Sequence, residues 1–277
     1  MIEKELNFRR LHKPTIPRGR YLPPMTSPTH RFRELHQTGL FVMPNPWDLG
    51  TTRLLADRGF PALATTSWGL AFSLGRSDYQ VTREELVAHT AMIAGAVDLP
   101  INVDAERLFP NEPGGVATTV RMLAEAGAAG CSIEDSMPAD RTIDPIEVAA
   151  EAVAIAAEAA QETGLLLTAR AENAFYGLGD IDETIARLQA YVAAGAEVAY
   201  APGLTDPQEI ARVVKEVPAP VNVLTRANGP SVQELAALGV RRVSTGGGLC
   251  RIAIAAVEKA LDDLLDGSGP QVGASPR

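Results

Sequence analysis

Acidic side chains gather after three neighbouring strands that the sequence predicts, and their chemistry is that of a metal site. Asp78 follows a strand expected at 62–66, Asp104 and Glu106 follow one expected at 101–103, and Glu134 directly follows one expected at 130–133. Carboxylates that face one another repel and raise each other's pKa unless a cation lies among them. Oxygen ligands suit Mg²⁺ or Mn²⁺, and Mg²⁺ keeps several waters. We therefore expect a divalent cation among these acids, bound partly through water.

A basic residue and three hydroxyl groups fall at the same strand ends. Arg170 follows the fifth predicted strand, and Thr65–Ser67 end the second. A guanidinium matches a carboxylate with two parallel hydrogen bonds, so Arg170 and these hydroxyls are candidates to hold a substrate carboxylate. None of the four histidines falls at a strand end, which argues against a zinc site built from histidine and cysteine.

Each of these features also has a structural interpretation. Asp104 and Glu134 could cap helices or pair with arginines, and Arg170 could pair with Glu172 or Glu134. Glycines 246–248 could cradle a phosphate, as barrels often do near their last two strands, or could form a tight turn. Of these two interpretations of the glycines, we favour the turn.

The elements that must position these residues repeat along the chain as a short apolar run followed by a longer stretch with helical spacing. The runs lack alternation, which is typical of parallel strands buried on both faces. The eight predicted strands are Leu40–Met43, Ala62–Thr66, Ile101–Val103, Gly130–Ile133, Leu165–Thr168, Val198–Tyr200, Val221–Val223 and Arg242–Ser244. The helices after them are predicted to begin near Asp48, Thr82, Gly114, Pro145, Asp182, Asp206, Pro230 and Leu249.

Eight alternations with tight turns favour a closed (β/α)₈ TIM barrel of the α/β class. Several predicted helices end in a small residue and a glycine just before the next strand, as at Gly127, Gly195 and Gly239. A doubly wound open sheet is the alternative, but it would more often carry a glycine-rich fingerprint after the first strand, where none stands. A further helix at 30–37 precedes the first strand and could close the bottom of the barrel.

The domain boundaries follow from composition. Residues 1–27 are rich in proline and basic residues without an apolar period, and we expect an N-terminal arm or disordered leader. The barrel should span residues 28–266. The Gly/Ser/Pro-rich residues 267–277 are expected to form a flexible tail.

Composition narrows the classes of partner. A net charge of −9 without a basic cluster argues against nucleic acid, and no apolar run reaches the roughly 20 residues of a membrane span. The first residues lack the pattern of a secretory signal, and the two cysteines, Cys131 and Cys250, are expected to be reduced thiols. We therefore expect a cytoplasmic protein with a small-molecule partner.

Short motifs along residues 32–265 together resemble the isocitrate lyase/phosphoenolpyruvate mutase superfamily. Each motif is weak alone, but their order and spacing are specific. The resemblance rests on Gly59–Leu63 leading to Ser73–Gly75 and Asp78, Val103–Glu106, Ala126–Gly130 with Ile133–Asp135, Ala169–Glu172, Pro202–Leu204 and Pro220–Val223.

This resemblance implies roles for particular residues and an assembly. It implies an enzyme that handles the enolate of a 2-oxo acid, or moves a phosphoryl group on phosphoenolpyruvate. It also implies a homo-oligomer, usually a tetramer, in which the last helix at 249–265 packs on a neighbouring subunit. The implied Mg²⁺ ligands, some acting through water, are Asp78, Asp104, Glu106 and Glu134. The implied substrate-binding residues are Thr66, Ser67, Trp68, Asn222 and Arg170, the last as carboxylate clamp.

The loop after the fourth strand departs from the family pattern. Isocitrate and methylisocitrate lyases carry K-K/R-C-G-H there, whereas this chain reads Pro-Ala-Asp-Arg-Thr at 138–142. The thiol acid of those lyases is therefore missing. Proton transfer would have to use Asp140, Arg141, Tyr176 or a metal-bound water.

Three functional hypotheses follow. The first is a Mg²⁺-dependent carbon–carbon lyase or decarboxylase that acts on a small 2-oxo or 2-hydroxy (di)carboxylate through an enolate. The second is a mutase-like or hydrolytic activity on a P–C bond, which should bring additional basic residues to the pocket. The third is a barrel that binds a metal and a ligand without catalysis, an option that the missing loop acid supports.

Overall fold

The computed structural model describes residues 26–137 and 140–269. Most of the predicted N-terminal arm and most of the predicted tail lie outside these residues. Ser27, at the edge of the described part, caps the first helix, because its hydroxyl accepts a hydrogen bond from the backbone N–H of His30 at 3.2 Å. Within the described ranges, no helix combines the length and the hydropathy that a membrane span requires.

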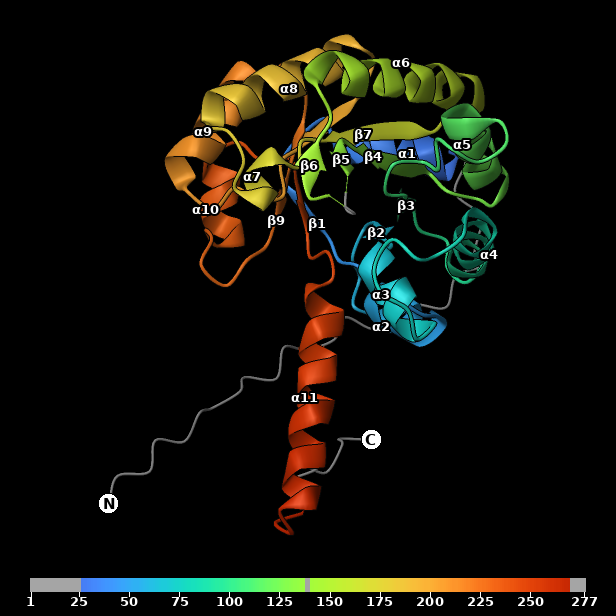
Figure 1. The fold of residues 1–277 in the computed structure, drawn as a ribbon, viewed down its shortest axis with the longest axis vertical. Coiled ribbons are helices and arrows are strands. Elements are labelled where there is room, and N and C mark those ends of the chain that lie inside the picture. Colours follow the sequence, from blue (N-terminus) through green and yellow to red (C-terminus); the bar gives the residue numbers. More distant parts are fainter. Residues whose placement is uncertain (1–25, 138–139, 270–277) are drawn as a thin grey trace, which may run out of the picture.

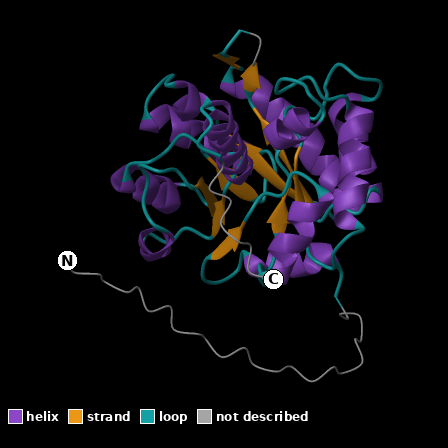
Figure 2. Cartoon of the chain, turned by 90° about the horizontal axis from the view of Figure 1, so that it is seen from below, coloured by secondary structure: helices purple, strands orange, loops and turns teal. Residues whose placement is uncertain are grey.

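Eight parallel strands form the barrel that the sequence predicts. Helices surround the strands, which lie at the centre of the molecule (Figures 1 and 2). In chain order the strands are β1 (Phe41–Met43), β2 (Leu63–Ala64), β3 (Ile101–Asp104), β4 (Gly130–Glu134), β7 (Leu166–Arg170), β8 (Val198–Tyr200), β9 (Val221–Leu224) and β10 (Arg242–Ser244). Their spatial order is β1-β10-β9-β8-β7-β4-β3-β2, and a backbone hydrogen bond from Ala64 to Pro44 joins the two ends.

Helices alternate with the strands, as the repeated pattern predicts. A short antiparallel pair, β5 (Ser136–Met137) and β6 (Thr142–Ile143), flanks the loop after β4. The helices are α1 (Pro28–Leu35), α2 (Leu49–Asp57), α3 (Ser67–Ser73), α4 (Arg83–Ala94), α5 (Gly115–Glu125), α6 (Ile146–Thr163), α7 (Asn173–Tyr176), α8 (Ile181–Ala193), α9 (Pro207–Glu216), α10 (Val232–Ala237) and α11 (Gly248–Leu265).

Helix starts agree with the sequence within a few residues. Thr82 and Glu85 form the capping box expected at the start of α4. Helix α8 begins at Ile181, one residue before the predicted Asp182, and Asp180 caps it, because its carboxylate accepts the N–H of Glu183 at 2.9 Å. The short elements α3, α7, β5 and β6 are absent from the sequence prediction. They are too short for the periodic spacing of apolar residues that marks a helix or a strand.

The first helix closes the bottom of the barrel. Phe32 of α1 is fully buried and clusters with Phe41, Leu166 and Val198, each the first residue of its strand. The N-terminal ends of the strands are therefore covered. Access to the barrel is left to the opposite, C-terminal end, where this fold places its active sites.

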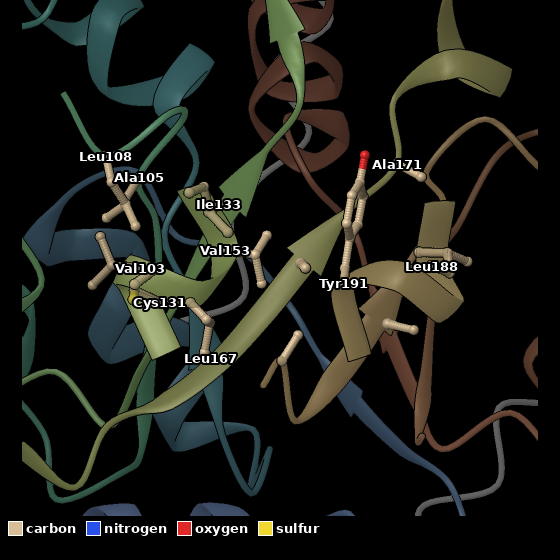
Figure 3. Close-up of a cluster of buried hydrophobic side chains, with 14 of the residues drawn as sticks. Val103, Ala105, Leu108, Cys131, Ile133, Val153, Leu167, Ala171, Leu188 and Tyr191 are labelled. Atoms are coloured by element: carbon tan, nitrogen blue, oxygen red, sulfur yellow. The ribbon is translucent and has the colours of Figure 1, made fainter. Parts of the chain in front are cut away.

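The main core lies between the strands and the surrounding helices. Val103, Cys131 and Leu167, on adjacent strands, cluster with Val153 of α6 and Leu188 of α8 (Figure 3). Cys131 is fully buried among apolar side chains and serves as a small core residue. By contrast, α11 projects away from the barrel (Figure 1) and leaves much of its apolar surface exposed.

Asn45 closes the barrel at the C-terminal ends of β1, β2 and β10. Its Nδ2 donates to the carbonyl of Thr65 at 2.6 Å, and its Oδ1 accepts the backbone N–H groups of Thr245 and Gly246, both at 2.9 Å. One buried amide thus holds the loops after β2 and β10 together.

We predict that Asn45→Ala lowers the free energy of unfolding by about 2 to 4 kcal/mol. The substitution leaves a carbonyl and two amides without their partner, and each such group costs about 1 to 3 kcal/mol when it stays buried. Urea unfolding followed by circular dichroism measures the change. Asn111→Ala, at an exposed loop position, is the control. Equal stability of the two variants would contradict a closing role for Asn45.

Candidate active site

A cavity of about 540 Å³ opens at the C-terminal end of the barrel. Residues from all eight barrel strands and from loops after them line it, so no single segment makes the site. The lining includes Thr65–Trp68, Asp78, Tyr79, Asp104, Arg170, Glu172, Phe175, Asn222, Arg226, Arg242 and Arg251. The volume is typical of a site for a small ligand.

Arg170 lies at the centre of the acidic side of this cavity. Its Nη1 is 2.7 Å from Oδ1 of Asp104, its Nη2 is 3.1 Å from Oε2 of Glu134, and its Nε is 2.7 Å from Oε1 of Glu172. The guanidinium also lies 5.4 Å above the ring centroid of Tyr200. These carboxylates raise the pKa of Arg170 well above its usual value, although burial opposes the charge. All three nitrogens of the predicted carboxylate clamp therefore face acids of the protein in this structure.

Asp104 connects this ion-pair cluster to the loop after β2. Its Oδ2 accepts the backbone N–H of Ser67 at 3.0 Å, and its own N–H donates to Oγ1 of Thr65 at 2.9 Å. Thr66 uses its hydroxyl to cap α3, through the N–H of Gly69. Thr66, Ser67 and Trp68 all line the cavity, as the resemblance implies, and their role in binding a substrate stays a prediction.

Glu134 is held by two hydroxyl groups that the sequence analysis missed. The Tyr79 hydroxyl donates to Oε1 of Glu134 at 2.6 Å, and the Ser136 hydroxyl donates to the same oxygen at 2.9 Å. Burial and the Glu134 charge raise the pKa of Tyr79, so the phenol keeps its proton. Tyr79 directly follows Asp78, and Ser136 stands two residues after Glu134, so proximity to predicted site residues was the available signal.

Asp78 and Glu106 lie beside the ion-pair cluster without a cation of their own. Burial, and then the charge of Asp104, raise the pKa of Asp78 to about 6 and that of Glu106 to about 8. Oδ1 of Asp78 is buried and has no hydrogen-bond partner among the described residues. Burial also raises the pKa of Glu172 to about 8, although this group pairs with Arg170, so the one guanidinium does not satisfy all the acids of the site.

The four predicted metal ligands fit a hard divalent cation held largely through water. Within residues 26–137 and 140–269, no three acidic, histidine or cysteine side chains converge as direct ligands of one ion. The donors are all carboxylate oxygens, one of them is unpartnered, and two of the groups have raised pKa values. A cation would relieve this repulsion, and Mg²⁺ commonly retains several of its waters.

Asn222 lies inside the barrel below the acids. Its Nδ2 donates to the Ser244 hydroxyl at 3.0 Å, and its Oδ1 accepts Nε of Arg242 at 3.0 Å. Arg242 is fully buried and also contacts Thr168 and His36, all neutral partners. Burial lowers the pKa of Arg242 to about 9. Asn222 lines the cavity floor, and its contact with a substrate stays a prediction.

The two loop residues predicted to transfer protons lie apart from this cavity. Asp140 and Arg141 are exposed, and neither belongs to the described lining. The Arg141 guanidinium lies 5.9 Å above the ring centroid of Tyr176, and its backbone is left-handed, with φ of 52°. The structure does not bring Asp140 and Arg141 together with the acids, and their catalytic role stays a prediction.

Ion pairs fix the base of the loop that carries these two residues. Arg107 binds Asp144 at 2.6 Å and donates to the carbonyl of Ser136 at 3.1 Å. Asp135 does not belong to the described lining of the cavity, and it accepts hydrogen bonds from Tyr191 at 2.6 Å and from the N–H of Glu172 at 2.9 Å. Asp135 therefore has a structural role, and it holds the backbone of one acid of the Arg170 cluster.

With this geometry established, comparison with known proteins identifies the family. Residues 32–265 match the model of the phosphoenolpyruvate phosphomutase family. The chain belongs to this family, within the phosphoenolpyruvate mutase/isocitrate lyase superfamily, as the sequence motifs suggested. It is an enzyme of the lyase and mutase type that this superfamily comprises.

Individual relatives cover most of the chain. A Burkholderia cenocepacia structure, classed only as a lyase or mutase, has 47% identity, a TM-score of 0.85, and a match over 90% of this chain and 92% of its own. An uncharacterised Mycobacterium tuberculosis protein is 37% identical over 78% of this chain and 81% of its own length. Oxaloacetate decarboxylase of Pseudomonas putida is 31% identical over 78% and 77% of the two chains.

The raised pKa values of Asp78 and Glu106 predict how the metal-free protein responds to pH. Both groups bind protons more tightly in the folded than in the unfolded chain, so folding stability should fall as pH rises from about 4 to about 8. Glu106→Gln removes one of the two groups and should make this decline shallower. Thermal unfolding across this range in the presence of a chelator measures the slope.

Glu112→Gln, at an exposed loop position, is the control for this measurement and should keep the wild-type slope. If Glu106→Gln and wild type declined in parallel, the carboxyl of Glu106 would not carry the raised pKa.

Proposed function

We propose that this chain is a Mg²⁺- or Mn²⁺-dependent carbon–carbon lyase. Its substrate would be a small 2-oxo or 2-hydroxy (di)carboxylate, and decarboxylation through an enolate is the simplest such reaction. The observation that carries the proposal is the set of acids around Arg170 at the open end of the barrel, with Asp78 and Glu106 left without a cation. The similarity to oxaloacetate decarboxylase supports the reaction class.

The roles of the chain's own residues follow from their contacts. Asp78, Asp104, Glu106 and Glu134 would hold the ion, some of them through water, and Tyr79 with Ser136 would orient Glu134. The ion, when bound, supplies positive charge that stabilises a developing enolate oxygen. Arg170 would hold the substrate carboxylate in place of one of its present ion pairs.

Proton transfer is assigned to the loop after β4. Asp140 and Arg141, with Tyr176 nearby, are the proposed proton-transferring groups, and they reach the cavity only if this loop closes over it. Closure would also exclude water and protect an enolate from side reactions. The ion pair of Arg107 with Asp144 would anchor the loop during such a movement.

A P–C bond activity is the second candidate. Arg226 and Arg251 line the cavity and provide the basic residues that a phosphonate substrate requires. The family model is also that of a phosphomutase. We rank this candidate second because an anionic carboxylate would satisfy the same two arginines.

The proposed metal and enolate chemistry can be tested with oxalate, a planar mimic of an enolate. The thermal midpoint should rise when Mg²⁺ and oxalate are added together, and much less with either alone, because ligands that bind only the folded state stabilise it. Glu134→Gln and Asp104→Asn should each abolish the joint effect. Differential scanning fluorimetry gives the midpoints.

Asp57→Asn, an exposed acid on α2, is the control and should keep the full shift. A shift produced by oxalate in the presence of a chelator would overturn the metal assignment. If no compound among oxalate, pyruvate, oxaloacetate, malonates and phosphonopyruvate raised the midpoint, the enolate chemistry would be rejected.

We also propose that the enzyme is a cytoplasmic homo-oligomer in which α11 packs on a neighbouring subunit. Val257, Leu261 and Leu264 lie on one face of this helix and are 59%, 52% and 54% exposed. Such an apolar face on a helix that projects from the barrel is typical of an interface between subunits.

The double variant Val257→Glu/Leu261→Glu is therefore expected to shift the protein to a smaller species, because charges in an apolar interface are costly to bury. Light scattering after size-exclusion chromatography gives the mass. Ala255→Glu places the same charge on the opposite face of α11 and should leave the mass unchanged. A wild-type mass equal to one chain would refute the proposed assembly.

A further inference from the structure

A buried positive charge inside the barrel has no negative partner. Arg242, the first residue of β10, is 1% exposed and forms no ion pair with any residue that the structure describes. Arg83 and Arg187 are also buried, and each pairs with a carboxylate. Removal of a charge from water is costly unless a counter-charge accompanies it. Arg242 therefore calls for a counter-charge that the described part of the chain does not provide.

The neutral partners of Arg242 leave part of its hydrogen-bonding capacity unused. Its Nε donates to Oδ1 of Asn222 at 3.0 Å, and its Nη2 donates to Oγ1 of Thr168 at 3.0 Å. Its Nη1 is 3.3 Å from Nε2 of His36. The other ring nitrogen of His36 is 2.7 Å from the Phe32 carbonyl, so the ring donates there and accepts at Nε2. These contacts use three of the five N–H groups of the guanidinium, and one on each terminal nitrogen is left over.

An amide without partners lies at the same end of the cavity. Asn102 of β3 is 4% exposed, and its Oδ1 is buried with no hydrogen-bond partner among the described residues. Phe32 lies beside both groups. The Cζ of Arg242 is 5.9 Å from the ring centroid of Phe32. A Cβ atom on Gly130 would lie 2.8 Å from Cε1 of Phe32 and 3.0 Å from Oδ1 of Asn102.

The cavity reaches both of these side chains. Arg242 and Asn102 belong to its lining, although they lie next to α1, the helix that closes the bottom of the barrel. The acids around Arg170 lie at the opposite, open end. A solvent ion can therefore reach the inner end through the cavity. Water there would satisfy the free N–H groups but would not balance the charge.

We propose that the inner end of the cavity binds a small inorganic monoanion, such as chloride, held by Arg242 and by the amide N–H of Asn102. One unbalanced guanidinium requires one negative charge, so a dianion would bury an excess charge of the opposite sign. The site uses neither the predicted metal ligands nor Arg170, so the inference does not depend on the proposed function. A bound anion would fix Arg242 and, through it, Asn222 at the cavity floor.

Thermal unfolding at constant ionic strength tests the proposal. The midpoint should rise and then saturate as chloride or bromide replaces gluconate, because a ligand that binds only the folded state stabilises it. Gluconate keeps the ionic strength constant, so screening alone gives no rise. Arg242→Gln, which keeps a donor for Asn222, and Asn102→Leu should each raise the apparent dissociation constant for chloride by roughly tenfold or more.

Two arginine variants serve as controls for this response. Arg226→Gln removes a different guanidinium from the cavity lining, and Arg53→Gln removes an exposed one on α2. Both should keep the wild-type dependence on chloride. The proposal is overturned if wild type shows no saturable rise, if Arg242→Gln keeps the full response, or if Arg226→Gln abolishes it.

Bromide diffraction locates the anion in the wild-type protein and does not depend on the folding of any variant. Crystals grown in sodium bromide should show an anomalous difference peak in contact with the terminal nitrogens of Arg242 and with the amide of Asn102. Peaks confined to other arginines, or to the surface, would mean an adventitious ion only. That result would overturn the proposal even if chloride raised the thermal midpoint.

Discussion

Charge balance around Arg170 is the constraint on which the rest of the site depends. Several acids meet at the open end of a barrel, where burial makes unpaired charge costly. One guanidinium balances Asp104, Glu134 and Glu172 at distances of 2.7 to 3.1 Å. It does not reach Asp78 or Glu106, and the pKa values of these two groups are raised. The acids of the site therefore outnumber its one paired guanidinium, and a divalent cation would supply further positive charge.

The barrel makes this crowding possible. Parallel neighbouring strands place Glu134 of β4 directly beside Arg170 of β7, and Asp104 ends the strand on the other side of β4. The seam between β1 and β2 is closed by Asn45, which ties the loop after β2 to the loop after β10. The same fold that concentrates the acids thus also fixes the loop after β10, which leads to Arg251.

Arg226 and Arg251 line the cavity from the segments that follow β9 and β10, apart in the chain from the acids after β2, β3 and β7. Family membership defines the lyase and mutase type of chemistry. The feature that sets this chain apart from the lyase motif lies outside the acids: the loop after β4 lacks the cysteine and histidine of that motif. Differences of this kind in loops change the substrate while the barrel stays the same.

Sequence alone was sufficient for the barrel, for its eight strands within a few residues, and for the family. These properties depend on the local spacing of apolar residues, on the order of strands and helices along the chain, and on short motifs. It was also sufficient to place the acids at strand ends, because the ends of parallel strands meet at one face. The start of α8 near Asp182 was placed to within one residue, but its cap, Asp180, was not identified, since side-chain capping is decided within one turn of a helix.

Only the tertiary structure decided which groups pair. Arg170 and Asp104 are 66 residues apart, and Tyr79 and Glu134 are 55 apart, so their contacts depend on how loops of different strands converge. For the same reason the structure, and not the sequence, shows that Arg170 faces three acids while Arg226 and Arg251 face none. Local patterns determine where a side chain leaves the backbone, but its partner and its pKa are set by distances between segments far apart in the chain.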